Sequence, residues 1–244
     1  MGLYFFSGKG GVGKTHLATS FAYSRAAMGQ KALLVEFSQF AQYSEYFETE
    51  VGFSPLKLDE NFFVASWTGR DCLREYVGKV LRSQKASDFF MKIPLMEKLI
   101  HVAPGLKEIS VLGKLTSDYR EINFSTDFDD IIFDAPSSGH FVSLLGVPES
   151  LGGIVGVGPM KKQCAAILNC LQTHNEVYIG IVGDGSSFSK TESAETELKI
   201  KELLKGRAVT KIHNLSKAFP YLNTGKWNES AKSLSSHWEE FKWS

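Results

Sequence analysis

Eight residues near the N-terminus have the types and the spacing that bind phosphate groups. The string Gly8–Thr15 reads G-K-G-G-V-G-K-T and fits the pattern G-x-x-x-x-G-K-[ST]. Glycines let the backbone turn tightly enough to point successive N–H groups at phosphate oxygens, and a following helix adds its positive N-terminus. Lys14 has the place of a lysine that reaches the β- and γ-phosphates, and Thr15 that of a hydroxyl that ligates Mg²⁺. The residues expected to contact a nucleotide here are Gly8, Lys9, Gly10, Gly11, Val12, Gly13, Lys14, Thr15 and His16.

A second string supplies a carboxylate for the metal side of such a site. Residues 128–140 read F-D-D-I-I-F-D-A-P-S-S-G-H, an apolar strand that ends in Asp134 and continues into small, turn-forming residues. Parallel sheets bind ligands at the carboxyl ends of their strands, so Asp134 is well placed to hold a Mg²⁺-bound water. A lone aspartate after a strand is more often a turn residue, but its combination with the phosphate loop favours the metal-side role.

The elements around these strings alternate between strands and helices. An apolar run at 3–6 leads into the glycine loop, a helical pattern runs from Lys14 to Gly29, and 31–36 is a second buried strand. This order is a βαβ unit, whose two strands are parallel. Further strands are expected at 62–66, 130–133, 177–182 and 208–213, and helices at about 69–83, 87–99, 141–150, 159–173 and 192–205. The alternation predicts an α/β fold with a mostly parallel sheet covered on both faces.

One domain is expected over residues 1–244, because no segment reads as a linker between two domains. The stretch at about 68–122 is the least sheet-like and is predicted to be a helical insertion. Near the C-terminus, 228–243 places Leu234, Trp238 and Phe241 on one helical face. The polar side of that helix mixes both charge signs, so we expect it to dock on the sheet or on a partner rather than on a membrane.

Composition excludes several classes of protein. The chain has 27 Lys and Arg against 27 Asp and Glu, so it lacks the basic excess that is typical of nucleic-acid binding. No apolar run reaches the roughly 18 residues that a membrane-spanning helix needs, and the first residues do not read as a secretory signal. The three cysteines, Cys72, Cys164 and Cys170, form no CxxC pair, which favours a reducing compartment. A cytoplasmic protein without stable membrane insertion is expected.

The motifs resemble those of one group of ATPases. The string K-G-G-x-G-K-T, with its early lysine Lys9, resembles the deviant phosphate loop of the MinD, ParA, nitrogenase iron-protein and ArsA group. The D-x-x-x-x-G-H pattern at 134–140 is similar to the second switch of the ArsA/GET family in particular. The similarity runs over nearly the whole chain and is strongest at 3–37 and 128–160. It implies a P-loop NTPase fold, a three-layer α/β/α sandwich, with ATP or ADP and Mg²⁺ as ligands.

The resemblance also implies roles for single residues. Lys9 would reach across a dimer interface to the other subunit's nucleotide, and it joins Lys14 and Asp134 as an expected catalytic residue. Thr15 and Asp134 would face the Mg²⁺ ion that arrives with the nucleotide. Asn214, at the end of the strand Ile212-His213-Asn214, is implied to contact the adenine. His140 falls in the second switch, although a lone histidine is more often a structural residue, and we expect no metal site built from protein ligands alone.

One departure from the family pattern concerns hydrolysis. The family carries an aspartate that positions the attacking water, in a string like S-T-D-P-A-H, whereas residues 36–41 read E-F-S-Q-F-A and put Ser38 at that place. A hydroxyl cannot act as a carboxylate base, yet phosphoryl transfer depends mainly on positioning and charge stabilisation. The sequence therefore predicts nucleotide binding with weak hydrolysis. Two alternatives remain: Glu36 assists the Mg²⁺ shell, or the alignment is shifted by two positions.

Two functional hypotheses follow. In the first, a homodimer, or a heterodimer with an ArsA-like paralogue, couples nucleotide state to the binding of a protein client. In the second, the chain is a hydrolysis-poor regulatory subunit of an active ArsA-like paralogue. The resemblance implies a cysteine cluster for arsenite and a CxxC pair for carriers of tail-anchored proteins. Both clients lose support here, because Cys164 and Cys170 are six residues apart and do not share a helical face. A small-molecule kinase or ligase is disfavoured by the switch at 134–140, and a DNA-partitioning or membrane-positioning ATPase by the neutral charge.

Overall fold

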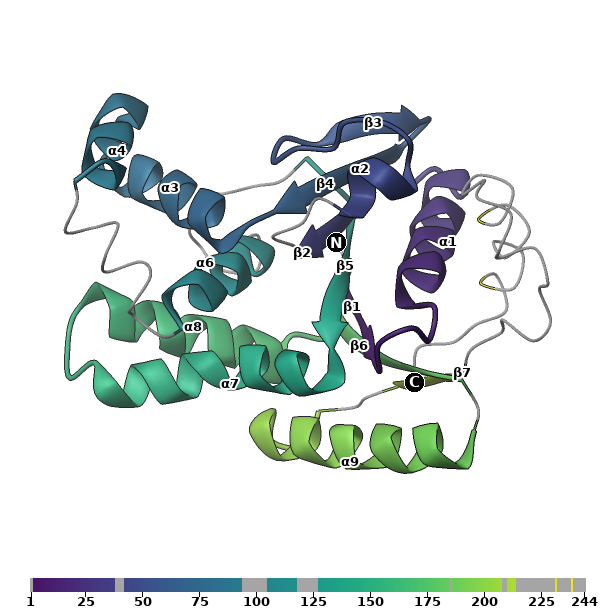
Figure 1. The fold of residues 1–244 in the computed structure, drawn as a ribbon. Coiled ribbons are helices and arrows are strands. Elements are labelled where there is room, and N and C mark those ends of the chain that lie inside the picture. The colour runs from purple at the N-terminus through teal and green to yellow at the C-terminus, as the bar shows by residue number, and fades with distance from the viewer. Residues whose placement is uncertain are drawn as a thin grey trace.

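The computed structural model describes residues 2–37, 42–93, 105–117, 127–184, 186–207 and 210–213, together with Ala231 and Trp238. Its centre is a seven-stranded sheet with the strand order β3-β4-β2-β5-β1-β6-β7 (Figure 1). Neighbouring strands are parallel except at one edge, where β3 runs antiparallel to β4. The strands are β1 (Gly2–Gly8), β2 (Ala32–Phe37), β3 (Leu56–Asp59), β4 (Phe62–Trp67), β5 (Asp130–Ser137), β6 (Val177–Gly183) and β7 (Thr210–His213).

Helices cover both faces of this sheet, and α1 lies on the face opposite α6, α7 and α8 (Figure 1). They are α1 (Lys14–Ala27), α2 (Gln42–Tyr46), α3 (Gly69–Val80), α4 (Gln84–Met91), α6 (Leu106–Leu115), α7 (Ser138–Ile154), α8 (Pro159–Thr173) and α9 (Ser187–Leu203). This arrangement confirms the expected α/β fold with a mostly parallel central sheet.

Two separate cores arise because successive side chains of a strand point to opposite faces. Leu3 and Phe5 of β1 are fully buried against α6, α7, α8 and α9. Tyr4 and Phe6, which alternate with these residues along β1, belong to the second core, which α1 covers. The central strands are thus apolar on both sides, as is typical of a parallel sheet between two helical layers.

The predicted elements agree with the structure in type and differ in extent. All six expected strands are present, and α8 has the expected bounds of 159–173. Strand β5 extends to Ser137 rather than ending at 133, and α7 begins at Ser138 rather than at 141, because the small residues after Asp134 continue the strand and then open the helix without a loop between them. The short elements β3 and α2 were not expected, since four or five residues carry too little periodicity to be recognised.

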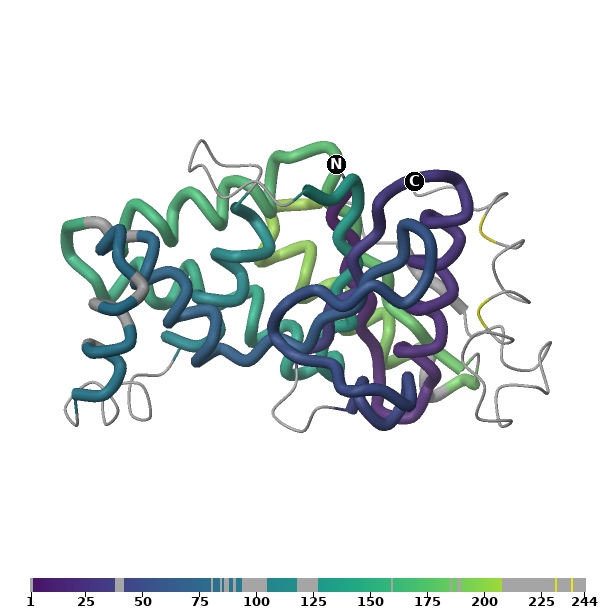
Figure 2. The backbone as a smooth tube through the Cα atoms, turned by 90° about the horizontal axis from the view of Figure 1, so that it is seen from above, coloured from purple at the N-terminus to yellow at the C-terminus, as the bar shows by residue number. Residues whose placement is uncertain are grey.

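Helices α3, α4 and α6 lie between β4 and β5 in the chain, within the range predicted for the helical insertion. Residues 94–104 and 118–126 of that range lie outside the described residues, and the description of 1–244 as one domain stays a prediction. Figure 2 shows α3 and α4 at the end of the molecule remote from α1.

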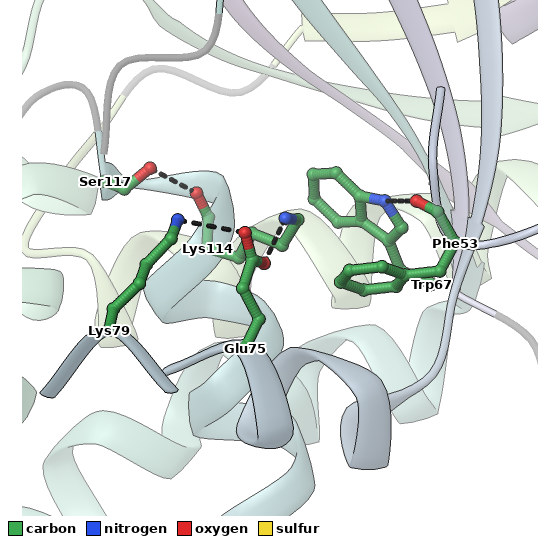
Figure 3. A network of polar contacts seen from close by, with 6 residues as sticks. All are labelled: Phe53, Trp67, Glu75, Lys79, Lys114 and Ser117. Atoms are coloured by element: carbon green, nitrogen blue, oxygen red, sulfur yellow. Dashed lines mark hydrogen bonds and ion pairs between the residues drawn. The ribbon is translucent and has the colours of Figure 1, made fainter. Parts of the chain in front are cut away.

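A polar and aromatic network ties the insertion to the sheet (Figure 3). Lys114 of α6 forms an ion pair with Glu75 of α3, and its Nζ lies 4.6 Å from the ring centroids of both Phe53 and Trp67. Lys79 pairs with the same Glu75 at 2.9 Å. The Trp67 indole N–H donates to the Phe53 carbonyl at 3.2 Å, which holds the ring in place. One lysine therefore joins two helices of the insertion to strand β4.

Part of the predicted C-terminal helix is described. Trp238 is buried against α1, and its indole N–H donates to the Ser20 hydroxyl at 2.8 Å. Its ring makes edge contacts with Phe6 and Phe21. The packing of Trp238 agrees with the docking expected for 228–243, whose other residues, apart from Ala231, lie outside the described part of the chain.

The network around Lys114 generates a stability prediction. Lys114→Ala is expected to lower the free energy of unfolding by about 1–3 kcal/mol, because a largely buried ammonium loses its ion pair and both rings. Lys79→Ala removes the more exposed partner of Glu75 and should cost less than about 1 kcal/mol. The side chains are 17% and 39% exposed, respectively, which is the reason for the difference. Urea unfolding followed by circular dichroism compares the two variants, and equal losses would contradict this account.

Candidate functional site

The glycine loop between β1 and α1 has a backbone conformation that residues with side chains could not adopt. Gly8, Gly11 and Gly13 have φ angles of 151°, 79° and 86°, a region that L-residues rarely adopt. A Cβ on Gly8 would also lie 2.1 Å from the carbonyl oxygen of Val182 on β6. By contrast, a Cβ on Gly10 or Gly11 would meet no atom within 4 Å, so this part of the loop faces open space.

The start of α1 is suited to an anion. Its N-cap residue, Gly13, provides no side-chain acceptor, and the first turn holds no acidic residue. Helices usually place an acceptor or a carboxylate there, because the first N–H groups lack partners within the helix and the dipole is positive at this end. Here a lysine, Lys14, occupies the first helical position instead. A bound phosphate would satisfy both the N–H groups and the lysine, so the residues present fit a nucleotide phosphate chain.

Lys14 folds back over the loop, and its Nζ donates to the carbonyl oxygen of Lys9 at 3.0 Å. Burial lowers the pKa of the Lys14 ammonium, and the nearby Asp134 carboxylate opposes that change. The partly desolvated Lys14 ammonium is thereby held beside the loop. Its attraction for an incoming anion is stronger there than that of an ammonium in bulk water.

Asp134 lies beside the loop at the carboxyl end of β5. The Thr15 hydroxyl donates to its Oδ2 at 2.7 Å, across 119 residues of sequence. Burial raises the pKa of Asp134 to about 6, the Thr15 hydrogen bond and Lys14 counteract this, and the charge of Glu36 adds to it. A hydroxyl and a carboxylate in contact are the donor set that Mg²⁺ takes at phosphate sites. Thr15 and Asp134 therefore fit the ion that a nucleotide brings.

Glu36 lies opposite Asp134 in the register of β2 and β5. Its two carboxylate oxygens accept from the Tyr43 backbone N–H at 3.2 and 3.3 Å, and only 4% of the residue is exposed. Burial raises the pKa of Glu36, while hydrogen bonds with Ser66 and Tyr43 counteract it. This carboxylate is committed to holding the start of α2, which weakens the alternative that it serves the Mg²⁺ shell.

Helix α2 supplies two side chains that sequence reasoning missed. The Tyr43 hydroxyl lies 3.4 Å from Asp134 Oδ2, and the Tyr46 hydroxyl lies 2.6 Å from His16 Nδ1. The expected nucleotide contact His16 thus directs its ring at α2, and burial lowers the pKa of that ring. Two tyrosines three residues apart in a short helix carry no motif, so only the fold reveals them.

The residues after Asp134 connect the site to α9. The Ser138 hydroxyl donates to Glu192 Oε1 at 3.0 Å, at a narrow cleft that Gly8 and Lys9 also line. His140 is exposed, and its Nδ1 lies 3.3 Å from the Ser137 hydroxyl. The predicted second switch at 134–140 therefore spans the last residues of β5 and the first turn of α7, in contact with the phosphate loop on one side and α9 on the other.

The structure brings Gly8–Thr15 and Asp134 together, as the sequence predicts for one site. Two other expected positions, Ser38 and Asn214, lie outside the described residues. Cys164 and Cys170 are buried in the apolar core, as expected for small hydrophobic side chains.

Two structural features are absent from the described residues. None of the helices they form is long and apolar enough to cross a membrane. In the same part of the chain, no three or more His, Cys, Asp or Glu side chains gather in a group that would hold a metal ion.

A parallel sheet with a glycine loop between β1 and α1, and a carboxylate at the end of the adjacent strand, defines a P-loop NTPase fold. Residues 1–218 match the family model for anion-transporting ATPases of the ArsA type. Because the match covers most of the chain, the protein belongs to this family.

Similar proteins come from bacteria and archaea. The chain is 31% identical to the "Putative arsenical pump-driving ATPase 2" of Aquifex aeolicus, over 64% of this chain and 52% of that protein. It is 29% identical to the "Putative arsenical pump-driving ATPase" of Halobacterium salinarum, over 66% of this chain and 26% of that protein. It is 24% identical to "ATPase BagA" of Mycobacterium tuberculosis, over 85% of this chain and 64% of that protein. In each case the chain spans less than two thirds of the relative's own length.

The burial of Asp134 generates a prediction with a defined pH dependence. Its pKa of about 6 in the folded protein exceeds the ordinary 3.8. Ionisation of Asp134, which prevails above pH 6, therefore lowers the free energy of unfolding. Without nucleotide, Asp134→Asn should therefore raise the free energy of unfolding at about pH 8 by roughly 1–3 kcal/mol. The gain should shrink as pH falls from about 6 to about 4, below which the wild-type carboxyl is neutral in both states. Denaturant unfolding across this range measures it, and a variant less stable than wild type at pH 8 would contradict burial as the dominant cause.

Proposed function

We propose that this protein binds ATP and ADP with Mg²⁺ at Gly8–Thr15 and hydrolyses ATP as a cytoplasmic switch of the ArsA/GET type. The observation that carries the proposal is the contact of Thr15 with Asp134 beside an open glycine loop. Membership of a family described as anion-transporting ATPases supports it. The names of the similar proteins, which include several pump-driving ATPases, support ATP as the nucleotide.

Each residue of the site has a physical task in this function. The loop N–H groups and the start of α1 would hold the phosphates, and Lys14 would neutralise charge that develops during phosphoryl transfer. Thr15 and Asp134 would hold Mg²⁺, which supplies further charge neutralisation when it is bound. No residue acts as a covalent catalyst in this scheme, since positioning and electrostatics provide most of the rate enhancement in such sites.

The switch part of the proposal concerns dimerisation and a protein client. Lys9 is exposed on the loop, where a lysine can reach a second subunit, and we propose a homodimer or a heterodimer with an ArsA-like paralogue. Ser138 and Glu192 link the end of β5 to α9, which gives nucleotide state a route to distant helices. The last residue of α7, Ile154, and Val157 in the turn before α8 are 79% and 89% exposed, which favours a protein partner over a nucleic acid.

A second candidate function rests on Ser38. Because this position carries a hydroxyl where the resembling family carries an aspartate, the chain could serve as a hydrolysis-poor regulatory subunit of an active paralogue. The commitment of Glu36 to the Tyr43 amide supports this candidate, since the nearest alternative carboxylate is engaged elsewhere.

The first functional prediction concerns Lys14. Lys14→Ala should reduce ATP turnover to the background rate, because the phosphates lose their nearest cation. Lys162→Ala on the exposed face of α8 is the matched control and should leave turnover unchanged. Phosphate release and thermal unfolding are measured on both variants. A folded Lys14→Ala protein with wild-type turnover would overturn the proposed site.

The second functional prediction separates the two candidates. If the chain is a hydrolysis-poor subunit, Ser38→Asp should raise turnover of the isolated protein by at least about tenfold, because a carboxylate would then position the attacking water. Turnover of the wild type, alone and mixed with an ArsA-like paralogue, is followed together with the oligomeric state. High turnover of the wild type alone would exclude the regulatory candidate.

A further inference from the structure

Helix α2 is joined to the nucleotide site by side chains from three different elements. Glu36 of β2 accepts from its Tyr43 backbone N–H, Asp134 of β5 lies beside the Tyr43 hydroxyl, and His16 of α1 lies beside the Tyr46 hydroxyl. A helix of five residues has little stability of its own. Its position therefore depends on tertiary contacts, which are the packing of its tyrosines in the core under α1 and the hydrogen bonds to the nucleotide site.

Tyr43 is the member of this helix that contacts the metal-side carboxylate. The residue is 1% exposed, and its ring packs edge-on against Phe47 with centroids 5.2 Å apart. Its backbone and its ring are thus both fixed, and the hydroxyl has no access to bulk water. A buried hydroxyl normally donates to a protein acceptor, and the Asp134 carboxylate is the acceptor at hand.

The two donors to this carboxylate differ in length. Asp134 Oδ2 accepts from Thr15 at 2.7 Å, whereas the Tyr43 hydroxyl is 3.4 Å from the same oxygen. The first distance is that of a strong O–H···O bond, and the second is longer than the usual range of such bonds. For both bonds to be strong, the Tyr43 hydroxyl would have to approach Oδ2 by roughly half an ångström. In the structure, Thr15 is therefore the strong donor to the carboxylate and Tyr43 the weak one.

We propose that Tyr43 is a positioning residue for Asp134: its hydroxyl fixes the carboxylate in the orientation that Mg²⁺ requires and thereby couples α2 to the metal. This inference rests on the proposed function, because it assumes that Mg²⁺ arrives at Asp134 with a nucleotide. Tyr43 itself touches neither nucleotide nor metal, and it acts through the carboxylate.

Tyr46 provides a matched control within the same helix. Its hydroxyl contacts His16 rather than Asp134, and its ring packs edge-on against Phe47 with centroids 4.8 Å apart. Tyr46→Phe and Tyr43→Phe each remove one hydroxyl and keep the ring. Only the second variant removes a donor to the carboxylate, so general loosening of α2 and a specific effect on Asp134 are separable.

The experiment measures ADP binding by calorimetry over a series of Mg²⁺ concentrations, on the full chain of wild type, Tyr43→Phe and Tyr46→Phe. Tyr43→Phe should raise the Mg²⁺ concentration for half-maximal enhancement of binding by about threefold to tenfold, the effect of losing one hydrogen bond of ordinary net strength. Its ADP affinity in EDTA and its melting temperature should stay close to those of wild type. Tyr46→Phe should leave the Mg²⁺ dependence unchanged.

Three results would overturn the inference. Identical Mg²⁺ curves for wild type and Tyr43→Phe would show that the hydroxyl does not act on the metal side. Equal shifts in both variants would show a general role of α2 in stability. An ADP affinity of wild type that does not respond to Mg²⁺ would remove the proposed function itself, and this inference with it, which distinguishes that failure from the other two.

Discussion

The hydrogen bond from Thr15 to Asp134 is the contact around which the rest of the site is arranged. It joins the first turn of α1 to the end of β5, two segments 119 residues apart in the chain. It forms because β1 and β5 are parallel neighbours, so that the loop after β1 and the carboxylate of β5 emerge at the same edge of the sheet. The glycine loop and the Asp134 carboxylate are therefore parts of one candidate site.

This arrangement requires a sheet that is buried on both faces. The alternation of Leu3, Tyr4, Phe5 and Phe6 sends side chains into two cores, and each core holds a helical layer. The helices that follow the strands then start at the carboxyl edge, where the N-terminus of α1 faces the phosphate loop. The same burial desolvates Lys14 and Asp134, which strengthens their interactions with ligands and sets the pKa changes of both groups.

Elements further from the loop differ in how they reach the site. Helix α2 contacts it directly through Tyr43 and Tyr46, and α9 does so through Glu192 and Ser138. The insertion is held instead by Lys114, which lies over the rings of Phe53 and of Trp67, the last residue of β4. Among the described segments, α2 and the start of α7 are thus directly connected to the end of β5, because they share hydrogen bonds with Asp134 or its neighbours.

The sequence by itself determined the nucleotide loop, the strand that carries Asp134, although not its end at Ser137, and the α/β class. These features are local: glycine spacing dictates the turn, and the apolar patterns that announce strands and helices repeat over a few residues. Only the tertiary structure decided that Glu36 holds α2, that Tyr43 lies beside Asp134 and that His16 faces Tyr46. It also added β3, too short at four residues to show a pattern. The physical reason is that such contacts join residues that are 7 to 91 positions apart, and their geometry depends on strand order and register, which no local spacing encodes.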